Sequence, residues 1–172
     1  GIVNGTTNFI LSSMDEEGVS YSDALRVAQK KGFAEADPTN DVCGYDAARK
    51  LAILASIGFR ANVTFDDVLV EGIEKISQKD VQYASEMGYA IKLLAVGTRQ
   101  DNGIALNVYP AFVPRTHPLA SVKGSYNAIY VTGNIVDDVM FYGRGAGSLP
   151  TASAVMADVI STAKHIMNGS TG

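Results

Sequence analysis

The sequence predicts an α+β domain in which helices pack on one face of a mostly antiparallel sheet. Three observations lead to this fold class. Apolar residues recur at helical spacing through the first 60 residues, change to a period of two between residues 91 and 142, and return to the helical period from residue 150. Because helices and strands are grouped along the chain and do not alternate, the order favours α+β over a parallel α/β sheet.

Two helices are predicted before residue 33. Residues 6–16 place Phe9 and Met14 on one helical face, and Gly18 is suited to a left-handed helix end. The second helix is expected to begin after Ser22 as its N-cap and to stop at Gly32. Both helices have an apolar side that can join a core.

A polar loop and a long buried helix follow. Residues 34–42 are rich in carboxylate and amide side chains, and residues 44–58 are rich in Ala and Leu. The helix is expected to bury the side chains of Ala48, Leu51, Ala52, Leu54 and Ala55. The polar loop therefore lies at the N-terminus of this helix.

Short helices, two hairpins and a final helix complete the prediction. The short helices are expected at residues 64–70 and 79–88, the strands at 91–98, 104–113, 127–133 and 135–142, and the final helix at 150–167. Asp101-Asn-Gly between the first two strands is a strong hairpin-turn signal. Helices would cover one face of the sheet and leave the other face for a second subunit.

Composition restricts the possible functions. The 172 residues are 47% hydrophobic and 19% charged, enough for one domain with a full core. The net charge of -4 and the absence of any Lys or Arg run argue against binding to nucleic acid or to an anionic membrane. A single cysteine, Cys43, excludes an internal disulfide framework and favours a reducing compartment, the cytoplasm. No apolar run is long enough to span a bilayer, so a soluble protein is expected, with both ends cut from a longer chain.

Acidic residues around the third predicted helix form the first candidate site. Glu35, Asp37 and Asp41 precede the helix, and Asp46 lies four residues before Lys50 on one helical face. One interpretation is an ordinary surface ion pair. The other is a half-buried lysine beside carboxylates that recognise a substrate ammonium group. The residues alone leave both interpretations open.

Other motifs give weaker signals. A calcium loop starting at Asp37 fails, because Val42 and Ala48 occupy the positions that need Gly and Glu. Gly143-Arg-Gly-Ala-Gly147 leads from a strand into a helix, which is either a plain turn or an anion-binding turn that touches a cofactor held by another domain. It is a poor dinucleotide fingerprint, since Ser148 replaces the third glycine. Cys43 is expected to be buried, and His117 and His165 to be structural or solvated.

Three motifs together resemble homoserine dehydrogenase across nearly the whole chain. They are Gly1-Ile-Val-Asn-Gly-Thr-Thr-Asn-Phe-Ile, Gly32-Phe-Ala-Glu-Ala-Asp-Pro through Asp46-Ala-Ala-Arg-Lys50, and Gly143-Arg-Gly-Ala-Gly-Ser-Leu-Pro-Thr. The resemblance implies NAD(P)-dependent interconversion of L-homoserine and L-aspartate 4-semialdehyde, a step toward threonine, methionine and isoleucine. It also implies that residues 1–172 are the substrate-binding, catalytic and dimerisation domain. The Rossmann domain that binds most of the NAD(P), and any regulatory ACT domain, would lie outside this segment.

The resemblance also implies roles for individual residues. Lys50 and Asp46 would be the catalytic pair, and Gly143, Gly145, Ala146 and Gly147 would approach the nicotinamide side of the cofactor. Glu35, Asp41, Thr6 and Phe33 would contact the substrate. Arg144 stands where many members have proline and Phe33 where some have tyrosine, so those two positions depart from the family pattern. The family's sodium site would lie upstream of Gly1, so no metal ligand is expected here.

Two rival hypotheses belong to other classes of protein. A stand-alone binding module would bind homoserine without any nucleotide-binding domain in its reading frame. An oligomerisation scaffold would form dimers that ignore homoserine. The complete reading frame tests the first rival, and titration calorimetry tests the second.

Overall fold

The computed structural model describes residues 1–169 and confirms the α+β class. The helices are α1 (Gly5–Glu17), α2 (Tyr21–Lys30), α3 (Thr39–Val42), α4 (Tyr45–Phe59), α5 (Gln78–Glu86) and α6 (Ser148–Met167), with 3-10 turns η1 (Phe65–Asp67) and η2 (Pro118–Ser121). The strands are β1 (Leu69–Val70), β2 (Tyr89–Gln100), β3 (Gly103–Pro114), β4 (Tyr126–Gly133) and β5 (Asp137–Arg144).

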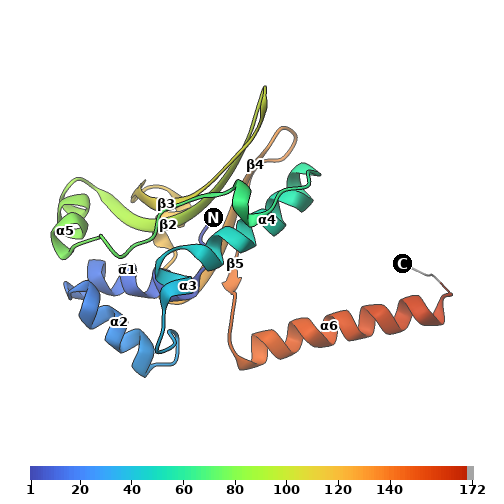
Figure 1. Cartoon of the computed structure of the whole chain (residues 1–172), viewed down its shortest axis with the longest axis horizontal. Helices are drawn as coiled ribbons and strands as arrows, with labels where there is room; N and C mark the ends of the chain where they lie inside the picture. The colour runs from blue at the N-terminus through green and yellow to red at the C-terminus, as the bar shows by residue number, and fades with distance from the viewer. Residues whose placement is uncertain (170–172) are drawn as a thin grey trace.

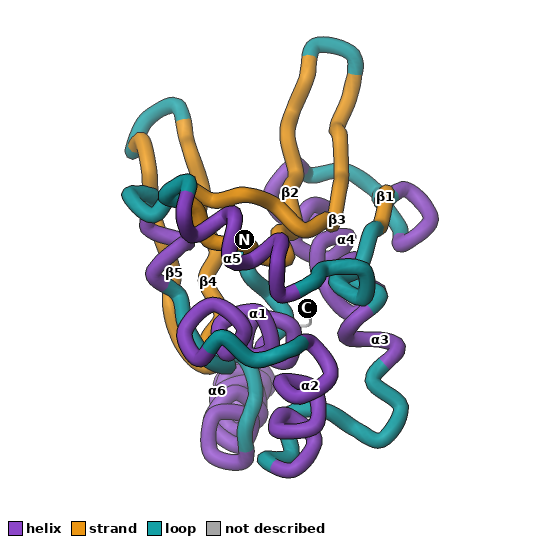
Figure 2. Tube along the Cα trace, turned by 90° about the vertical axis from the view of Figure 1, so that its left-hand side faces the viewer, coloured by secondary structure: helices purple, strands orange, loops and turns teal. Residues whose placement is uncertain are grey.

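Two antiparallel hairpins form the β part of the fold. β2 pairs with β3 from Tyr89↔Pro114 to Gln100↔Gly103, and the short β1 adds to the free edge of β3 in parallel. β4 and β5 form a separate two-stranded sheet. Figure 2 shows the hairpins as two arms with the N-terminal segment between them.

The first two residues join the hairpins. The Gly1 nitrogen donates to the carbonyl of Ala95 on β2 at 2.7 Å, and the Ile2 amide donates to the carbonyl of Ala128 on β4 at 2.7 Å. The segment therefore acts as a very short strand between β2 and β4. It delivers the following residues, at the start of α1, to a fixed place beside both sheets.

The main hydrophobic core lies between the helices and the β2–β3 hairpin (Figure 1). Its fully buried members include Ile10 and Met14 of α1, Ala48 of α4 and Val108 of β3. A smaller cluster under η2 packs residues of β2, β3 and β4. The expected burial on one helical face of α1 and of α4 is thus confirmed, except that Leu54 is 37% exposed.

Several predicted boundaries are wrong for local reasons. α2 begins at Tyr21, because the Ser20 side chain caps it by accepting from the Asp23 amide at 3.2 Å. Residues 64–70 do not form a helix: the 3-10 turn η1 ends at Asp67, and Leu69–Val70 pairs with β3. β5 begins two residues later than predicted, at Asp137, whose φ is +52°.

The final helix, α6, forms as predicted, but in the structure it does not join the core. It extends away from the rest of the molecule in Figure 1, and none of its residues is buried. Leu149, Val155 and Ile166 are among its exposed apolar side chains. Across residues 1–169, no helix combines the length and apolarity needed to cross a membrane.

Candidate active site

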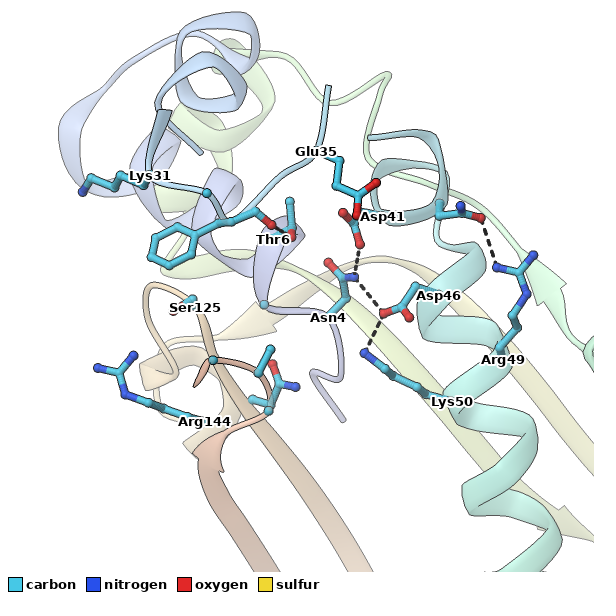
Figure 3. Close-up of a pocket in the computed structure, with 18 of the residues that line it drawn as sticks. Asn4, Thr6, Lys31, Glu35, Asp41, Asp46, Arg49, Lys50, Ser125 and Arg144 are labelled. Atoms are coloured by element: carbon cyan, nitrogen blue, oxygen red, sulfur yellow. Dashed lines mark hydrogen bonds and ion pairs between the residues drawn. The ribbon is translucent and has the colours of Figure 1, made fainter. Parts of the chain in front are cut away.

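A cleft of about 640 Å³ brings together segments that are far apart in the sequence. One wall comes from the start of α1, the loop after α2 and the first turns of α4, and the opposite wall from residues 125–127 and 144–147. Nine of the ten residues predicted for the site line it: Thr6, Phe33, Glu35, Asp41, Asp46, Lys50, Gly145, Ala146 and Gly147. Figure 3 shows the charged side chains that converge on the first wall.

Asp46 and Lys50 form an ion pair on the first turns of α4. Lys50 Nζ lies 2.7 Å from Asp46 Oδ2 and also donates to the carbonyl oxygen of Val3 at 3.2 Å. The side chains are 47% and 31% exposed for Lys50 and Asp46. The predicted half-buried position is therefore confirmed for Asp46, whereas Lys50 is exposed. This exposure lets the lysine reach a ligand in the cleft while the aspartate holds its head group.

The position of this pair follows from the start of α4. Gly44 is the N-cap with φ +83°, a conformation that favours glycine. A Cβ at this position would lie only 3.1 Å from a methyl group of Val70 and 3.2 Å from one of Val108. Gly44 therefore allows the helix to begin directly against β1 and β3, which aims its first turns at the cleft.

Asn4, which was not predicted as a site residue, links Asp41 and Asp46 on this wall. Its Nδ2 donates to Asp41 Oδ1 at 2.7 Å and to Asp46 Oδ2 at 2.9 Å. Its Oδ1 accepts from the Thr7 amide at 2.9 Å and so caps α1. The signal available in the sequence was an asparagine immediately before a helical pattern, which is a typical N-cap.

The remaining predicted substrate contacts come from α1, α3 and the loop between α2 and α3. Thr6 Oγ1 donates to the carbonyl of Phe33 at 2.6 Å, and the Phe33 ring packs on Phe9 with centroids 5.0 Å apart. In Figure 3 the carboxylates of Glu35 and Asp41 point toward the same part of the cleft. The Thr6 hydroxyl is thus already engaged in holding the loop, and Phe33 offers an apolar surface.

The glycine-rich wall is built mainly from backbone. A Cβ at Gly145 would lie 1.9 Å from Asn127 Nδ2, so a larger residue at this position would displace the Asn127 side chain. Gly147 is the N-cap of α6 and provides no side-chain cap, so the first backbone amides of this helix have no side-chain acceptor there. Gly143 lies within β5 opposite Asn127 and lines a neighbouring, mostly apolar groove, so it does not line the cleft.

Asn127, Ser125 and Arg144 also line the cleft and were not predicted as ligand contacts. Asn127 Oδ1 is buried and has no hydrogen-bond partner among the described residues. The Arg144 guanidinium lies 4.7 Å from the centre of the Tyr126 ring. Only the folded arrangement of β4 and β5 places these residues at the cleft.

The remaining chemical candidates lie outside the cleft. The prediction that Cys43 is buried is wrong: it is half-buried, and its thiol donates to Glu74 at 3.0 Å, which raises the pKa of Cys43 to about 11. His117 Nδ1 accepts from the Leu119 amide at 3.1 Å, a structural role as expected. His165 is on the exposed surface of α6. Within the described part of the chain, no group of three His, Cys, Asp or Glu side chains could hold a metal ion.

These features define an α+β domain with a cleft lined by several carboxylates and by Lys50. The family model described as homoserine dehydrogenase matches residues 1–160. The chain is 49% identical over 172 residues to homoserine dehydrogenase of Bacillus subtilis, covering all of this chain and 40% of that protein. The chain therefore belongs to the homoserine dehydrogenase family, and it spans about 40% of the length of this curated relative.

Solved structures agree with the sequence match. The crystal structure of a homoserine dehydrogenase from Thiobacillus denitrificans is similar with a TM-score of 0.93 and 47% identity, over 96% of this chain and 38% of that one. A hyperthermophilic archaeal homoserine dehydrogenase in complex with NADPH is similar with a TM-score of 0.73 and 29% identity. That match covers 92% of this chain and 44% of the archaeal one.

Proposed function

We propose that residues 1–172 are the substrate-binding and catalytic domain of a homoserine dehydrogenase. The reaction is the NAD(P)-dependent interconversion of L-homoserine and L-aspartate 4-semialdehyde, toward threonine, methionine and isoleucine. The observation that carries this proposal is the Asp46–Lys50 pair beside Glu35 and Asp41 in one cleft. A lysine for proton transfer and carboxylates for an ammonium group are what this substrate requires.

Lys50 is assigned the proton of the substrate hydroxyl. In the direction of oxidation Lys50 would accept that proton, and in the direction of reduction it would return one to the aldehyde oxygen. Asp46, 2.7 Å from Nζ, fixes the position of the amine and stabilises its charged form. NAD(P) supplies the hydride chemistry when it is bound.

Glu35 and Asp41 are assigned the substrate ammonium group. Both line the cleft on the same wall as Lys50, so a bound amino acid would place its ammonium group and its hydroxyl on that wall. Misplacement of the reacting carbon by about 1 Å could cost on the order of 100-fold in rate. Thr6 and Phe33 support this placement by fixing the loop and closing its apolar side.

The opposite wall fits the nicotinamide end of a dinucleotide. Gly145, Ala146 and Gly147 present backbone to the cleft, and the amide side chain of Asn127 lines it beside them. These residues would hold only the end of the cofactor that enters the cleft. The larger part is assigned to a Rossmann domain outside this chain, because the glycine segment follows an antiparallel hairpin and not a βαβ unit.

The test compares this chain with the complete protein that contains it. The complete protein is expected to reduce NAD(P) in the presence of homoserine, and the 172-residue chain alone is expected to show no such activity. Homoserine-dependent reduction of NAD(P) by the isolated chain would contradict the proposal that another domain binds most of the cofactor. Calorimetry separates the rivals: a stand-alone module would bind homoserine with no nucleotide domain in its gene, and a scaffold would bind none.

We further propose that the intact protein is a cytoplasmic homodimer that associates through its sheets. The support is the exposed apolar surface of the strands, which includes Phe112, Val131, Phe141 and Tyr142. Light scattering of the complete protein at micromolar concentration is expected to give twice the chain mass. A monomer under those conditions would contradict the proposal.

A further inference from the structure

Asn4 has a contact pattern that exceeds what a helix cap needs. Capping α1 uses only Oδ1, which accepts from the amide and the hydroxyl of Thr7, both at 2.9 Å. The other end of the side chain directs its two N–H groups at two different carboxylates, Asp41 and Asp46. Serine, threonine or aspartate could serve as the cap, but only an amide can cap and donate twice.

The surroundings of Asn4 make these two hydrogen bonds important. Asn4 is 5% exposed, so water has little access to replace it between the carboxylates. Asp41 comes from α3 and Asp46 from α4, and like charges brought together from separate elements repel each other. In Figure 3 the Asn4 amide lies between them, with Lys50 on the far side of Asp46.

We propose that Asn4 is a positioning residue that sets the distance and orientation of the two carboxylates. Through Asp46 it fixes the proton-transfer amine of Lys50, and through Asp41 it fixes the ammonium site. This inference rests on the proposed function, because it assigns the two carboxylates to two parts of the same reaction. It predicts that loss of the amide affects kcat through one partner and KM through the other.

The experiment is a pair of double-mutant cycles in the complete protein. Asn4→Ser keeps a good cap and removes both donors. It is expected to lower kcat and to raise KM for homoserine, each by about 10-fold to 100-fold, the size of a lost hydrogen bond to a charged group. In an Asp46→Asn background the same change should lower kcat little further, and in an Asp41→Asn background it should raise KM little further.

A matched control separates positioning from helix stability. Ser77 caps α5 by accepting from the Asp80 amide and does not line the cleft, so Ser77→Ala removes a cap of similar worth. It is expected to lower the melting temperature without changing kcat or KM. Additive effects in both cycles, or a kinetic loss in Ser77→Ala as large as in Asn4→Ser, would overturn the inference.

A spectroscopic measurement decides the inference even if the proposed function fails. If the complete protein shows no homoserine-dependent activity, the reaction assignment is wrong. NMR of the selectively labelled Asn4 side chain then tests the geometry directly. Both N–H protons should be shifted downfield and protected from exchange, and Asp46→Asn should change one far more than the other. Two rapidly exchanging protons that do not respond to Asp46→Asn would overturn the positioning role.

Discussion

Helices α1 and α6 both begin at the cleft, but they are held in opposite ways. Nine of the thirteen residues of α1 are buried, and its first turn is capped by the Asn4 side chain. α6 has twenty residues, none of them buried, and its N-cap Gly147 offers no side chain. The helix that leaves the first wall is therefore fixed by packing within this chain, whereas the helix that leaves the opposite wall has no buried residue to fix it.

The comparison explains which chemistry each wall can carry. Proton transfer needs side chains held to a fraction of an ångström, and the α1 wall meets this need through hydrogen bonds among Asn4, Asp46 and Lys50. The opposite wall, from which α6 begins, presents mainly backbone and includes Gly147, whose φ is +128°. This wall is therefore held by fewer buried residues of the chain than the wall at α1.

The largest predicted effect removes the proton-transfer group from the fixed wall. In the complete protein, Lys50→Ala should lower kcat by about 100- to 10,000-fold with a smaller change in KM, because a proton-transfer group acts mainly in the transition state. Glu35→Ala should instead raise KM for homoserine, because an ammonium contact is made in both ground and transition states. Steady-state kinetics of the two variants measures the contrast.

Two controls distinguish loss of proton transfer from loss of charge and from unfolding. Lys50→Arg keeps the charge but hardly gives up a proton, so it should also be slow. A melting curve for each variant shows whether the loss comes from unfolding, since Lys50→Ala leaves Asp46 without its cation. Near-normal turnover of a folded Lys50→Ala protein would remove the catalytic assignment.

The next effect concerns the buried lysine that anchors α1. Lys92 on β2 is 3% exposed, and its Nζ donates to the carbonyl of Val122 at 2.6 Å and to Asn8 Oδ1 at 3.0 Å. Burial lowers the pKa of Lys92 to about 8, with smaller opposing contributions from the nearby acidic residues Asp15 and Glu16. The folded state therefore loses the proton of Lys92 at lower pH than the unfolded state.

The sign of the pH dependence follows from this lowered pKa. Between pH 8 and 10.5, the usual pKa of lysine, the unfolded chain binds more protons, so the contribution of Lys92 to stability rises with pH. As pH falls from 10.5 to about 8, this gain in stability is lost, and below pH 8 it is absent. Urea unfolding of wild type and Lys92→Met should diverge by up to about 3 kcal/mol in favour of wild type across this range. A constant difference from pH 7 to 10 would contradict it.

The sequence was sufficient for the contacts of the cleft that arise within one helix and insufficient for those that depend on strand pairing. Asp46 and Lys50 share a helical face, so a spacing of four residues predicts their contact. Asn4 meets Asp46 only because Gly1 and Ile2 pair with β2 and β4, a long-range event that no local pattern signals. Likewise, Asn127 reaches Gly145 through strand pairing in the β4–β5 hairpin.

The elements show the same division between local and long-range causes. The hairpin of β2 and β3 follows from Asp101-Asn-Gly and the alternation around it, and the structure pairs these strands as predicted. The error at residues 64–70 arose because a short apolar segment fits a helix or a strand equally well. In the structure Leu69 and Val70 form a strand because they pair with the edge of β3. The exposure of α6 could not be predicted for a similar reason: apolar periodicity predicts a helix but does not say which surface, if any, the helix packs against.

The smallest predicted effect removes α6 itself. Because no α6 residue is buried, a chain that ends at Gly147 should melt within about 2 °C of the 172-residue chain, a change worth well under 1 kcal/mol for a domain of this size. It should also aggregate less, since Leu149, Val159 and Ile166 no longer expose apolar surface. Circular dichroism and light scattering on both chains give the two readouts. A fall in melting temperature of more than about 5 °C would mean that α6 packs on the body of the chain in solution, and then the α6 wall of the cleft would be fixed from within, like the wall of α1.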